Sequence, residues 1–217
     1  ILVVTPGYSL VALEAKTGRP VPGFGRAGVV DMMAEKARLE GYTPAQMVGA
    51  IGNSSPPVVA RDTIVVGAAL VEGSRPQSRA NVRGTVLAFD VRTGRLRWTF
   101  AGVPAPGAPG SETWEGDSLS YTGNGGVWAP MAYDDTLGTL YLPVEAPTND
   151  YYGGQRLGDN LYSSALVALD ITTGRRRWHQ QIVHHDIFDW DNTTAPILMD
   201  LTVDGRPVRA VTQLTKQ

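Results

Sequence analysis

The sequence predicts an all-β fold made of repeated, four-stranded antiparallel units. Three observations lead to this prediction. One short pattern occurs three times, its copies follow each other at a nearly constant interval, and pairs of further strands lie between the copies. The copies cover residues 10–19, 85–98 and 165–178.

Each copy describes a β-hairpin together with its turn. The second copy reads T-V-L-A-F-D-V-R-T-G-R-L-R-W and the third reads A-L-V-A-L-D-I-T-T-G-R-R-R-W. Apolar and polar residues alternate at the period of a half-buried strand, break at Thr-Gly and then resume. The turn glycines Gly18, Gly94 and Gly174 are 76 and 80 residues apart. Such a regular interval indicates a repeat architecture.

Strands predicted between the copies complete the units. The first full unit joins 56–60 and 63–69 to the hairpin 85–100, and the second joins 127–133 and 140–144 to the hairpin 165–181. Four-stranded units that recur around a ring are the blades of a β-propeller. We expect the end of one blade at 1–22, whole blades at 53–100 and 127–182, and the start of another at 195–217. Because the sequence starts inside a predicted strand, we expect it to be a piece of a longer protein.

The interval between the copies leaves room for long insertions, since a compact blade needs only about 40–45 residues. In an up-and-down blade, the tight turns lie at one end of the strands and the long connections lie at the other. The long connections predicted here are 71–84, 101–126, 145–164 and 183–194. Insertions gathered on one face of a repeat array usually mark its binding face.

Composition excludes several classes of partner. The formal net charge of −2 gives no basis for binding nucleic acid or an anionic membrane surface. The longest apolar run, 64–71, is far shorter than the roughly 20 residues that span a bilayer, so no membrane segment is expected. The chain has no cysteine, which excludes disulfides and thiolate metal sites.

Several local motifs favour ordinary structure over a ligand site. Residues 23–28, G-F-G-R-A-G, match a dinucleotide fingerprint, but Pro20 and Pro22 precede them where a buried strand is required, so a glycine-rich loop is expected. Residues 31–40 predict a short helix within an insertion. The run G-N-G-G at 123–126 is typical of a flexible turn, and the three arginines at 175–177 are typical of a solvated strand edge.

Longer motifs carry a resemblance to a known family. The repeat A-x-D-x-x-T-G-x-x-x-W occurs with V-W-A-P-M-A-Y-D at 127–134, E-A-P-T-N-D-Y-Y-G-G at 145–154, V-H-H-D-I-F-D-W-D at 183–191 and V-T-Q-L-T-K-Q at 211–217. Together they resemble the PQQ-dependent quinoprotein dehydrogenases, particularly the glucose dehydrogenase type and its soluble relatives. The resemblance implies an eight-bladed propeller with pyrroloquinoline quinone (PQQ) on its axis, of which this chain would supply about three blades.

The resemblance also implies roles for four residues. Trp128 would be the floor on which the planar quinone stacks, although a core tryptophan is the ordinary alternative. Asp189 would be the general base that takes the proton from the substrate hydroxyl. Lys216 would contact the quinone oxygens, where a fixed cation stabilises the charge that reduction adds. Thr148 would hydrogen-bond the cofactor, although Thr-Asn-Asp is also ordinary turn chemistry.

A metal is part of what the resemblance implies, but its ligands are not assigned. Such enzymes use a divalent ion, usually calcium, to polarise the quinone. This chain has Ala146 where related alcohol dehydrogenases have an asparagine ligand, and no clear Asp-Asn pair lies near Arg75 and Pro76. His184 and His185 do not favour a metal site, because neighbouring residues of an extended segment point to opposite sides.

Two functions of different class follow. The first is oxidation of a sugar or alcohol by a periplasmic PQQ-dependent dehydrogenase, with electrons passed to ubiquinone or a cytochrome c. The second is a non-catalytic propeller that serves as a protein-assembly scaffold, like the lipoprotein of the outer-membrane assembly machinery. A scaffold would need the tryptophans and Thr-Gly turns of the repeat. It would have no use for Trp128, Asp189 and Lys216 in their sequence contexts.

Overall fold

The computed structural model describes residues 1–70 and 78–217, and this part of the chain is mainly antiparallel β-sheet. The strands are β1 (Leu2–Val4), β2 (Ser9–Ala12), β3 (Val29–Asp31), β4 (Ile51–Gly52), β5 (Val58–Ala60), β6 (Thr63–Val66), β7 (Ala69–Leu70), β8 (Val86–Asp90), β9 (Leu96–Phe100), β10 (Ala132–Asp134), β11 (Thr139–Pro143), β12 (Ala165–Asp170), β13 (Arg176–Gln181), β14 (Ile197–Val203) and β15 (Arg206–Thr212). The helices are α1 (Met32–Glu40), α2 (Pro44–Met47) and the 3₁₀ turns η1 (Ser111–Thr113) and η2 (Ser118–Ser120).

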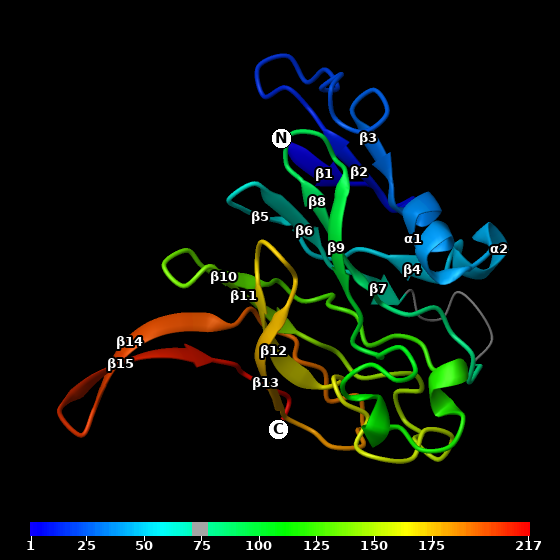
Figure 1. Ribbon diagram of the computed structural model, residues 1–217, viewed down its shortest axis with the longest axis vertical. Helices are drawn as coiled ribbons and strands as arrows, with labels where there is room; N and C mark the ends of the chain where they lie inside the picture. The colour runs from blue at the N-terminus through cyan, green and yellow to red at the C-terminus, as the bar shows by residue number, and fades with distance from the viewer. Residues whose placement is uncertain (71–77) are drawn as a thin grey trace.

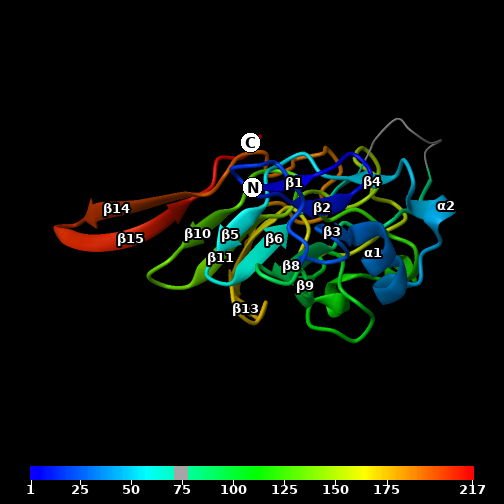
Figure 2. The same ribbon diagram turned by 90° about the horizontal axis from the view of Figure 1, so that it is seen from above.

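Two complete blades form the centre of the structure. One has the strand order β5-β6-β8-β9 and the other has the order β10-β11-β12-β13, and all neighbours pair antiparallel. The sheet β1-β2-β3 precedes them and the hairpin β14-β15 follows them (Figure 1). Seen from above, this last hairpin extends away from the other sheets (Figure 2). The predicted all-β fold with four-stranded blades is confirmed.

The core lies between successive sheets. In the first blade, Ile64 and Leu87 pack toward the β1-β2-β3 sheet, whereas Val65 and Ala88 pack toward the second blade. Because both faces of these inner strands are covered, every residue of β6 is buried. The outer strand β9 instead alternates between exposed and covered positions. Continuous apolar strands inside and alternating strands outside are what stacked sheets require.

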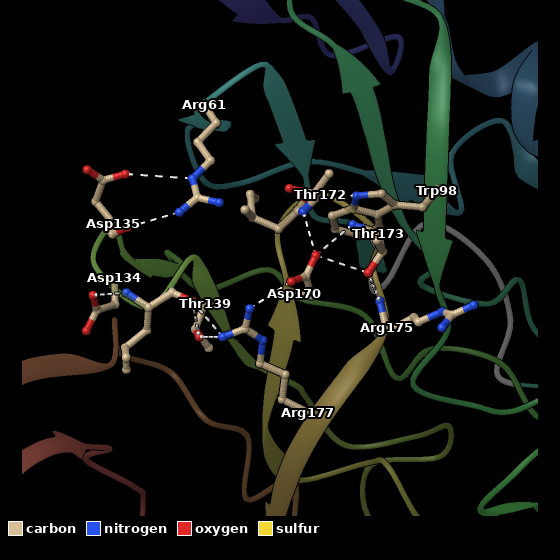
Figure 3. Close-up of polar contacts among 12 residues, drawn as sticks. Arg61, Trp98, Asp134, Asp135, Thr139, Asp170, Thr172, Thr173, Arg175 and Arg177 are labelled. Atoms are coloured by element: carbon tan, nitrogen blue, oxygen red, sulfur yellow. Dashed lines mark hydrogen bonds and ion pairs between the residues drawn. The ribbon is translucent and has the colours of Figure 1, made fainter.

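The repeated turn is held by its aspartate. Asp170 Oδ1 accepts hydrogen bonds from the backbone of Thr172 and Thr173 at 3.0 and 2.9 Å and from the Thr173 hydroxyl at 3.0 Å (Figure 3). Asp90 binds the corresponding turn of the first blade in the same way. Glycine follows the threonine because φ is +68° at Gly174, a conformation that other residues adopt at a cost.

Trp98 joins the two blades. Its indole Nε1 donates to the carbonyl of Ile171 at 2.9 Å, in the turn that Asp170 organises (Figure 3). A side chain at Gly174 would meet this ring, since a Cβ there would lie 2.6 Å from Trp98 Cδ2. The tryptophan of one repeat therefore packs on the Thr-Gly turn of the next. Trp178, its equivalent in the second blade, is 39% exposed and lines a groove of about 360 Å³ beside β14 and β15.

The arginines at 175–177 are exposed at the edge strand β13, as predicted, and one of them also has a structural role. Arg177 donates to the Leu137 carbonyl and the Thr139 hydroxyl and forms an ion pair with Asp170 at 2.7 Å (Figure 3). Arg97 makes the equivalent hydrogen bonds to the Asp62 carbonyl and the Thr63 hydroxyl. Each arginine ties the outer hairpin of a blade to the start of its second strand.

The first copy of the repeat departs from the other two. Pro20 forms only an isolated bridge with Leu13, and β2 pairs on one side with β1 and on the other with β3, which lies beyond the range 1–22 expected for this blade. Residues 23–28 form a loop that is followed by a strand, not by the helix that a dinucleotide site needs. The Gly25 amide donates to the Thr93 carbonyl at 2.9 Å, and Phe24 is buried against the adjoining Gly94 turn. This loop replaces the packing that Trp98 provides in the following repeat.

The helical insertion covers the first sheet. Asp31 caps α1 by accepting from the Ala34 amide at 3.0 Å, and Gly41 ends the helix with φ of +76°, as predicted for 31–40. Lys36 is fully buried and is neutralised by Glu40 at 2.8 Å. None of the described helices is long and apolar enough to cross a membrane.

Candidate functional site

The long connections meet at one end of the blades. The Thr148 amide donates to the Gly123 carbonyl, the Glu115 amide to the Leu157 carbonyl and the Gly84 amide to the Asn124 carbonyl. In Figure 1, most of these loops gather at the lower right of the sheets, away from the tight turns of β5-β6 and β10-β11. The prediction that the long connections share one face is confirmed. Part of the first of them, 71–77, together with Arg75 and Pro76, lies outside the described residues.

The G-N-G-G run is buried, not an exposed flexible turn as predicted. Asn124 donates its amide to the Val82 carbonyl at 2.9 Å, and Gly126 donates to Glu145 Oε1 at 2.8 Å. A Cβ at Gly126 would lie 2.4 Å from the Ala68 carbonyl oxygen, so only glycine fits between these backbones. The run therefore serves as a rigid inner wall on which the neighbouring connections are hydrogen-bonded.

Trp128 lies at the end of this wall. It precedes β10 by several residues and does not open the strand, which corrects the expectation from the sequence. Its indole Nε1 donates to Asp191 Oδ2 at 3.0 Å, and its carbonyl accepts from the Ser54 hydroxyl at 2.9 Å and from the Ser55 hydroxyl. The side chain is partly exposed. An aromatic ring that is anchored at its N–H and open on part of its surface suits a stacking role better than a core role.

Asp189 and Lys216 form an ion pair beside Trp128. The Lys216 Nζ lies 3.0 Å from Asp189 Oδ2 and donates to the Asp189 carbonyl at 2.6 Å. Asp189 has φ of +54°, and its amide donates to the Asp150 carbonyl. Lys216 lies beyond the end of β15. The ion pair joins the connection after β13 to the segment after β15.

Asp191 connects Trp128 to the ion pair of Asp189 and Lys216. Its Oδ2 also lies 3.9 Å from Lys216 Nζ, and its Oδ1 accepts from the Ala146 amide at 2.7 Å. Burial and the nearby Asp189 charge raise the pKa of Asp191 to about 6, although the hydrogen bonds that it accepts oppose this. Burial alone would lower the pKa of Lys216, but its hydrogen bond to Asp189 and the charges of Asp191 and Asp189 raise it. The ammonium therefore stays charged.

Glu145 adds a further carboxyl group to the site. It is buried at the end of β11, and burial, followed by the charge of Asp191, raises its pKa well above the ordinary range. Asp189 and Asp191 lie beside the Lys216 ammonium, and Glu145 is near enough to Asp191 for that charge to act on it. Clefts that hold several carboxyl groups with shifted pKa values are candidate functional sites.

Thr148 is buried close to this cluster, and Arg156 holds its loop in place. The Arg156 guanidinium is fully buried and donates to the carbonyls of Thr148, Asn149 and Asp186 and to the Asn160 side chain at 2.8 Å. Through these bonds it ties the connection after β11 to the connection that carries Asp189. The Thr148 hydroxyl has no hydrogen-bond partner among the described residues.

Unpartnered buried polar atoms supply the test for a cofactor. Besides the Thr148 hydroxyl, the side-chain oxygens of Thr122, Asn124, Asn192 and Gln213 are buried without a partner in the described part of the chain. Asn192 adjoins Asp191, and Asn124 lies in the glycine-rich wall. Buried polar groups are normally paired with protein, ordered water or a ligand, so these atoms have unused capacity for a polar ligand. The Trp128 ring and the Thr148 hydroxyl have the chemistry to hold a flat, polar cofactor.

A metal site is not formed by these residues. In 1–70 and 78–217, no group of three or more His, Asp or Glu side chains is placed to hold an ion. His184 lies 3.2 Å from an Asp159 oxygen, whereas His185 Nδ1 lies 2.9 Å from the Gly158 carbonyl. The segment is bent, with φ of +50° at His185, and not extended as predicted. The divalent ion that the resemblance implies therefore does not fit the described residues alone.

The predicted site is separate from a cleft of about 810 Å³ on the first blade. That cleft lies between the helical insertion and the loops after β9, and its lining includes Tyr42, Arg83 and Tyr121. None of Trp128, Thr148, Asp189 and Lys216 lines it.

Sequence reasoning brought four residues together but missed those that hold them. Trp128, Asp189 and Lys216 converge, and Thr148 lies in the adjoining connection. Asp191 received no role because the resemblance assigns the general base to Asp189, and Glu145 and Arg156 were not predicted to belong to the site. The D-W-D spacing at 189–191 was the only available signal, since irregular loops do not show which of their side chains turn inward.

Comparison with known proteins shows the family of the chain. The whole chain, residues 1–217, matches the PQQ family described as the β-propeller domain of glucose, ethanol and alcohol dehydrogenases. The chain belongs to this family. The PQQ-family chain is 34% identical over 213 residues to quinoprotein glucose dehydrogenase from Escherichia coli, covering 97% of this chain and 25% of that protein. It is 35% identical over 210 residues to a probable quinate dehydrogenase (quinone) from Xanthomonas campestris, and the match covers 95% of this chain and 25% of that protein.

Solved structures show the same relationship. The quinohemoprotein alcohol dehydrogenase ADHIIG from Pseudomonas putida superposes on the PQQ-family chain with a TM-score of 0.78 at 29% identity, covering 99% of this chain and 30% of that one. The PQQ-family chain thus spans about a quarter to a third of the length of the relatives it matches.

Proposed function

We propose that the protein containing this chain is a PQQ-dependent dehydrogenase that oxidises the hydroxyl group of a sugar or alcohol. The observation that carries the proposal is the convergence of Trp128, Asp189 and Lys216, joined through Asp191. The curated relatives are named as glucose, glycerol, quinate and alcohol dehydrogenases, and these names support the reaction class.

Each residue has a role that its surroundings allow. PQQ, when bound, supplies a quinone that accepts hydride from the substrate carbon. Trp128 provides the plate on which a planar ring stacks. Thr148 offers a buried hydroxyl that has no partner among the described residues and can hydrogen-bond the cofactor.

Proton transfer falls to Asp189. A general base must lie within hydrogen-bond reach of the hydroxyl proton that it removes. The ion pair with Lys216 holds Asp189 in place and puts a cation where a reduced quinone would gain negative charge. No step is assigned to a metal, because the described residues do not form a site for one. Ubiquinone or a cytochrome c as electron acceptor, and a periplasmic location, remain part of the proposal through family resemblance.

The scaffold function is less well supported. A scaffold needs the packing of Trp98 on the Thr-Gly turn, which this chain has. It does not need a buried carboxylate on the Trp128 indole or a set of unpartnered buried oxygens. Those features carry a desolvation cost that a ligand would offset.

Replacement of Asp189 by asparagine tests the proposal. In the full-length protein, supplied with PQQ and calcium, Asp189→Asn should retain PQQ and reduce dye-linked turnover of sugars and alcohols by about 10²–10⁴-fold, the contribution of a general base. Asp159→Asn is the matched control, since Asp159 lies in a neighbouring connection and its side chain is exposed. Unchanged turnover in Asp189→Asn would remove this residue as the base. Failure of the wild-type protein to bind PQQ would refute the function as a whole.

A further inference from the structure

The carboxylate of Asp191 holds three segments of the site together. Its Oδ2 accepts from Trp128 Nε1 at 3.0 Å, and its Oδ1 accepts from the Ala146 amide at 2.7 Å. Lys216 Nζ lies 3.9 Å from Oδ2. Trp128 precedes β10, Ala146 follows β11 and Lys216 follows β15, so one side chain spans the ends of three strands.

We infer that Asp191 is a positioning residue that sets the orientation of the Trp128 ring and the place of the Lys216 ammonium for the cofactor. This inference rests on the proposed function of the site. Trp128 is only partly buried and Lys216 is 34% exposed, so packing alone does not fix either side chain. A hydrogen bond to an ionised acceptor is roughly twice as strong as a neutral one, and Asp191 is itself 8% exposed.

The chemistry of Asp191 differs from that of Asp189. Both oxygens of Asp191 accept hydrogen bonds from protein donors, which leaves little capacity for a substrate hydroxyl. Asp189 is held through Lys216 and keeps acceptor capacity toward the site. Asp191 therefore acts through Trp128 and Lys216, whereas Asp189 is the group that would touch the substrate.

An amide cannot replace the Asp191 carboxylate. Asparagine has the same shape but offers one acceptor oxygen and one NH₂ donor. Against the Trp128 indole and the Ala146 amide, which are both donors, Asp191→Asn must place a donor opposite a donor. The variant should thus release the indole or the Ala146 backbone while preserving volume.

A double-mutant cycle separates positioning from general stability. In the full-length protein, PQQ affinity is measured by titration for the wild type, Asp191→Asn, Trp128→Phe and the double variant. Trp128→Phe keeps an aromatic plate but removes the indole donor. Asp191→Asn should weaken PQQ binding by about 10–100-fold, as expected when a buried charged hydrogen bond is lost. In the Trp128→Phe background, the same change should cost less than about threefold, because the bond is already absent.

Controls decide between the outcomes. Asp200→Asn, on β14, is the matched control because its side chain is 87% exposed, and it should leave both PQQ affinity and the absorption band of bound PQQ unchanged. The band should shift in Asp191→Asn, which a purely structural role at a distance would not cause. If Asp191→Asn does not fold, Asp191→Glu takes its place in the cycle, because its longer side chain displaces the carboxylate. Its loss of PQQ affinity must likewise be smaller in the Trp128→Phe background than in the wild type.

Two results would overturn the inference. Either Asp191→Asn binds PQQ as tightly as the wild type, or the losses from Asp191→Asn and Trp128→Phe multiply as those of independent sites do. Both results leave the proposed function intact, because the wild type would still bind PQQ and turn over. A wild-type protein that binds no PQQ would overturn both proposals.

Discussion

Replacement of Gly174 by alanine measures how tightly one blade packs on the next. Gly174 has φ of +68°, and an added Cβ would lie 2.6 Å from Trp98 Cδ2, which is closer than carbon atoms approach. The left-handed backbone costs an alanine about 1–2 kcal/mol. Displacement of the Trp98 ring, whose indole is also bonded to Ile171, adds about 1–3 kcal/mol of overpacking. We therefore expect Gly174→Ala to lower the free energy of unfolding by about 3 kcal/mol.

Gly41 is the matched control for this prediction. Its φ of +76° is similar, but no atom lies within 4 Å of an added Cβ. Gly41→Ala should thus show only the backbone cost of about 1–2 kcal/mol. The measurement is equilibrium urea unfolding of the full-length protein, followed by circular dichroism. Trp98→Leu in the Gly174→Ala background should recover part of the loss, because the smaller side chain makes room. Equal losses at Gly174 and Gly41, or no recovery with Trp98→Leu, would refute the packing argument.

Two further predictions concern the turn aspartate and the buried arginine. The hydrogen bond from Arg177 and those from the turn lower the pKa of Asp170 to about 2 from 3.8, so its stabilising effect is complete above pH 3.8 and is lost as the pH falls toward 2. Because the turn is partly exposed, the ionised Asp170 should stabilise the fold by only about 1 kcal/mol. The free energy of unfolding of Asp170→Asn should therefore be lower than that of the wild type at about pH 6, and the two values should converge as the pH falls to about 2. Arg156→Lys keeps the charge but cannot reach four acceptors, so it should lower the free energy of unfolding by about 2–4 kcal/mol. Arg92→Lys is the control, and because Arg92 is exposed its loss should be less than about 0.5 kcal/mol. A difference between Asp170→Asn and the wild type that does not change with pH would contradict the first prediction. Equal losses of stability in Arg156→Lys and Arg92→Lys would contradict the second.

The parts of the fold that sequence could predict are those with local causes. The alternation of residues along β8 and β12, and the Asp-to-Thr-Gly turns that follow them, are specified within fourteen residues. The first repeat was harder to predict, because Phe24 reaches the Gly94 turn from a loop and not from a strand. The packing of Phe24 in place of a repeat tryptophan depends on a contact between residues that are distant in sequence, and a local sequence pattern does not reveal such a contact.

The candidate site also contains residues that the sequence could predict and residues that it could not. Trp128, Asp189 and Lys216 could be located by motif and strand count, since those fix the end of the blade at which a residue lies. Their exact neighbours could not, because Asp191 and Asp189 are two residues apart on an irregular loop and only its backbone path decides which carboxylate faces Trp128. The G-N-G-G run was misjudged for a related reason. Glycine permits both a flexible turn and a close approach of backbones, and the choice is made by surrounding strands.

The charge balance of the site bears on how PQQ would lie in it. Asp189 and Asp191 place two carboxyl groups beside one ammonium, and the Arg156 guanidinium already donates to carbonyl oxygens and the Asn160 side chain. PQQ carries carboxylates of its own, which these acids would repel. Lys216 would stabilise the negative charge that a bound quinone gains on reduction. Asp189 and Asp191 would therefore favour a cofactor that turns its quinone oxygens toward Lys216 and its carboxylates away from these acids.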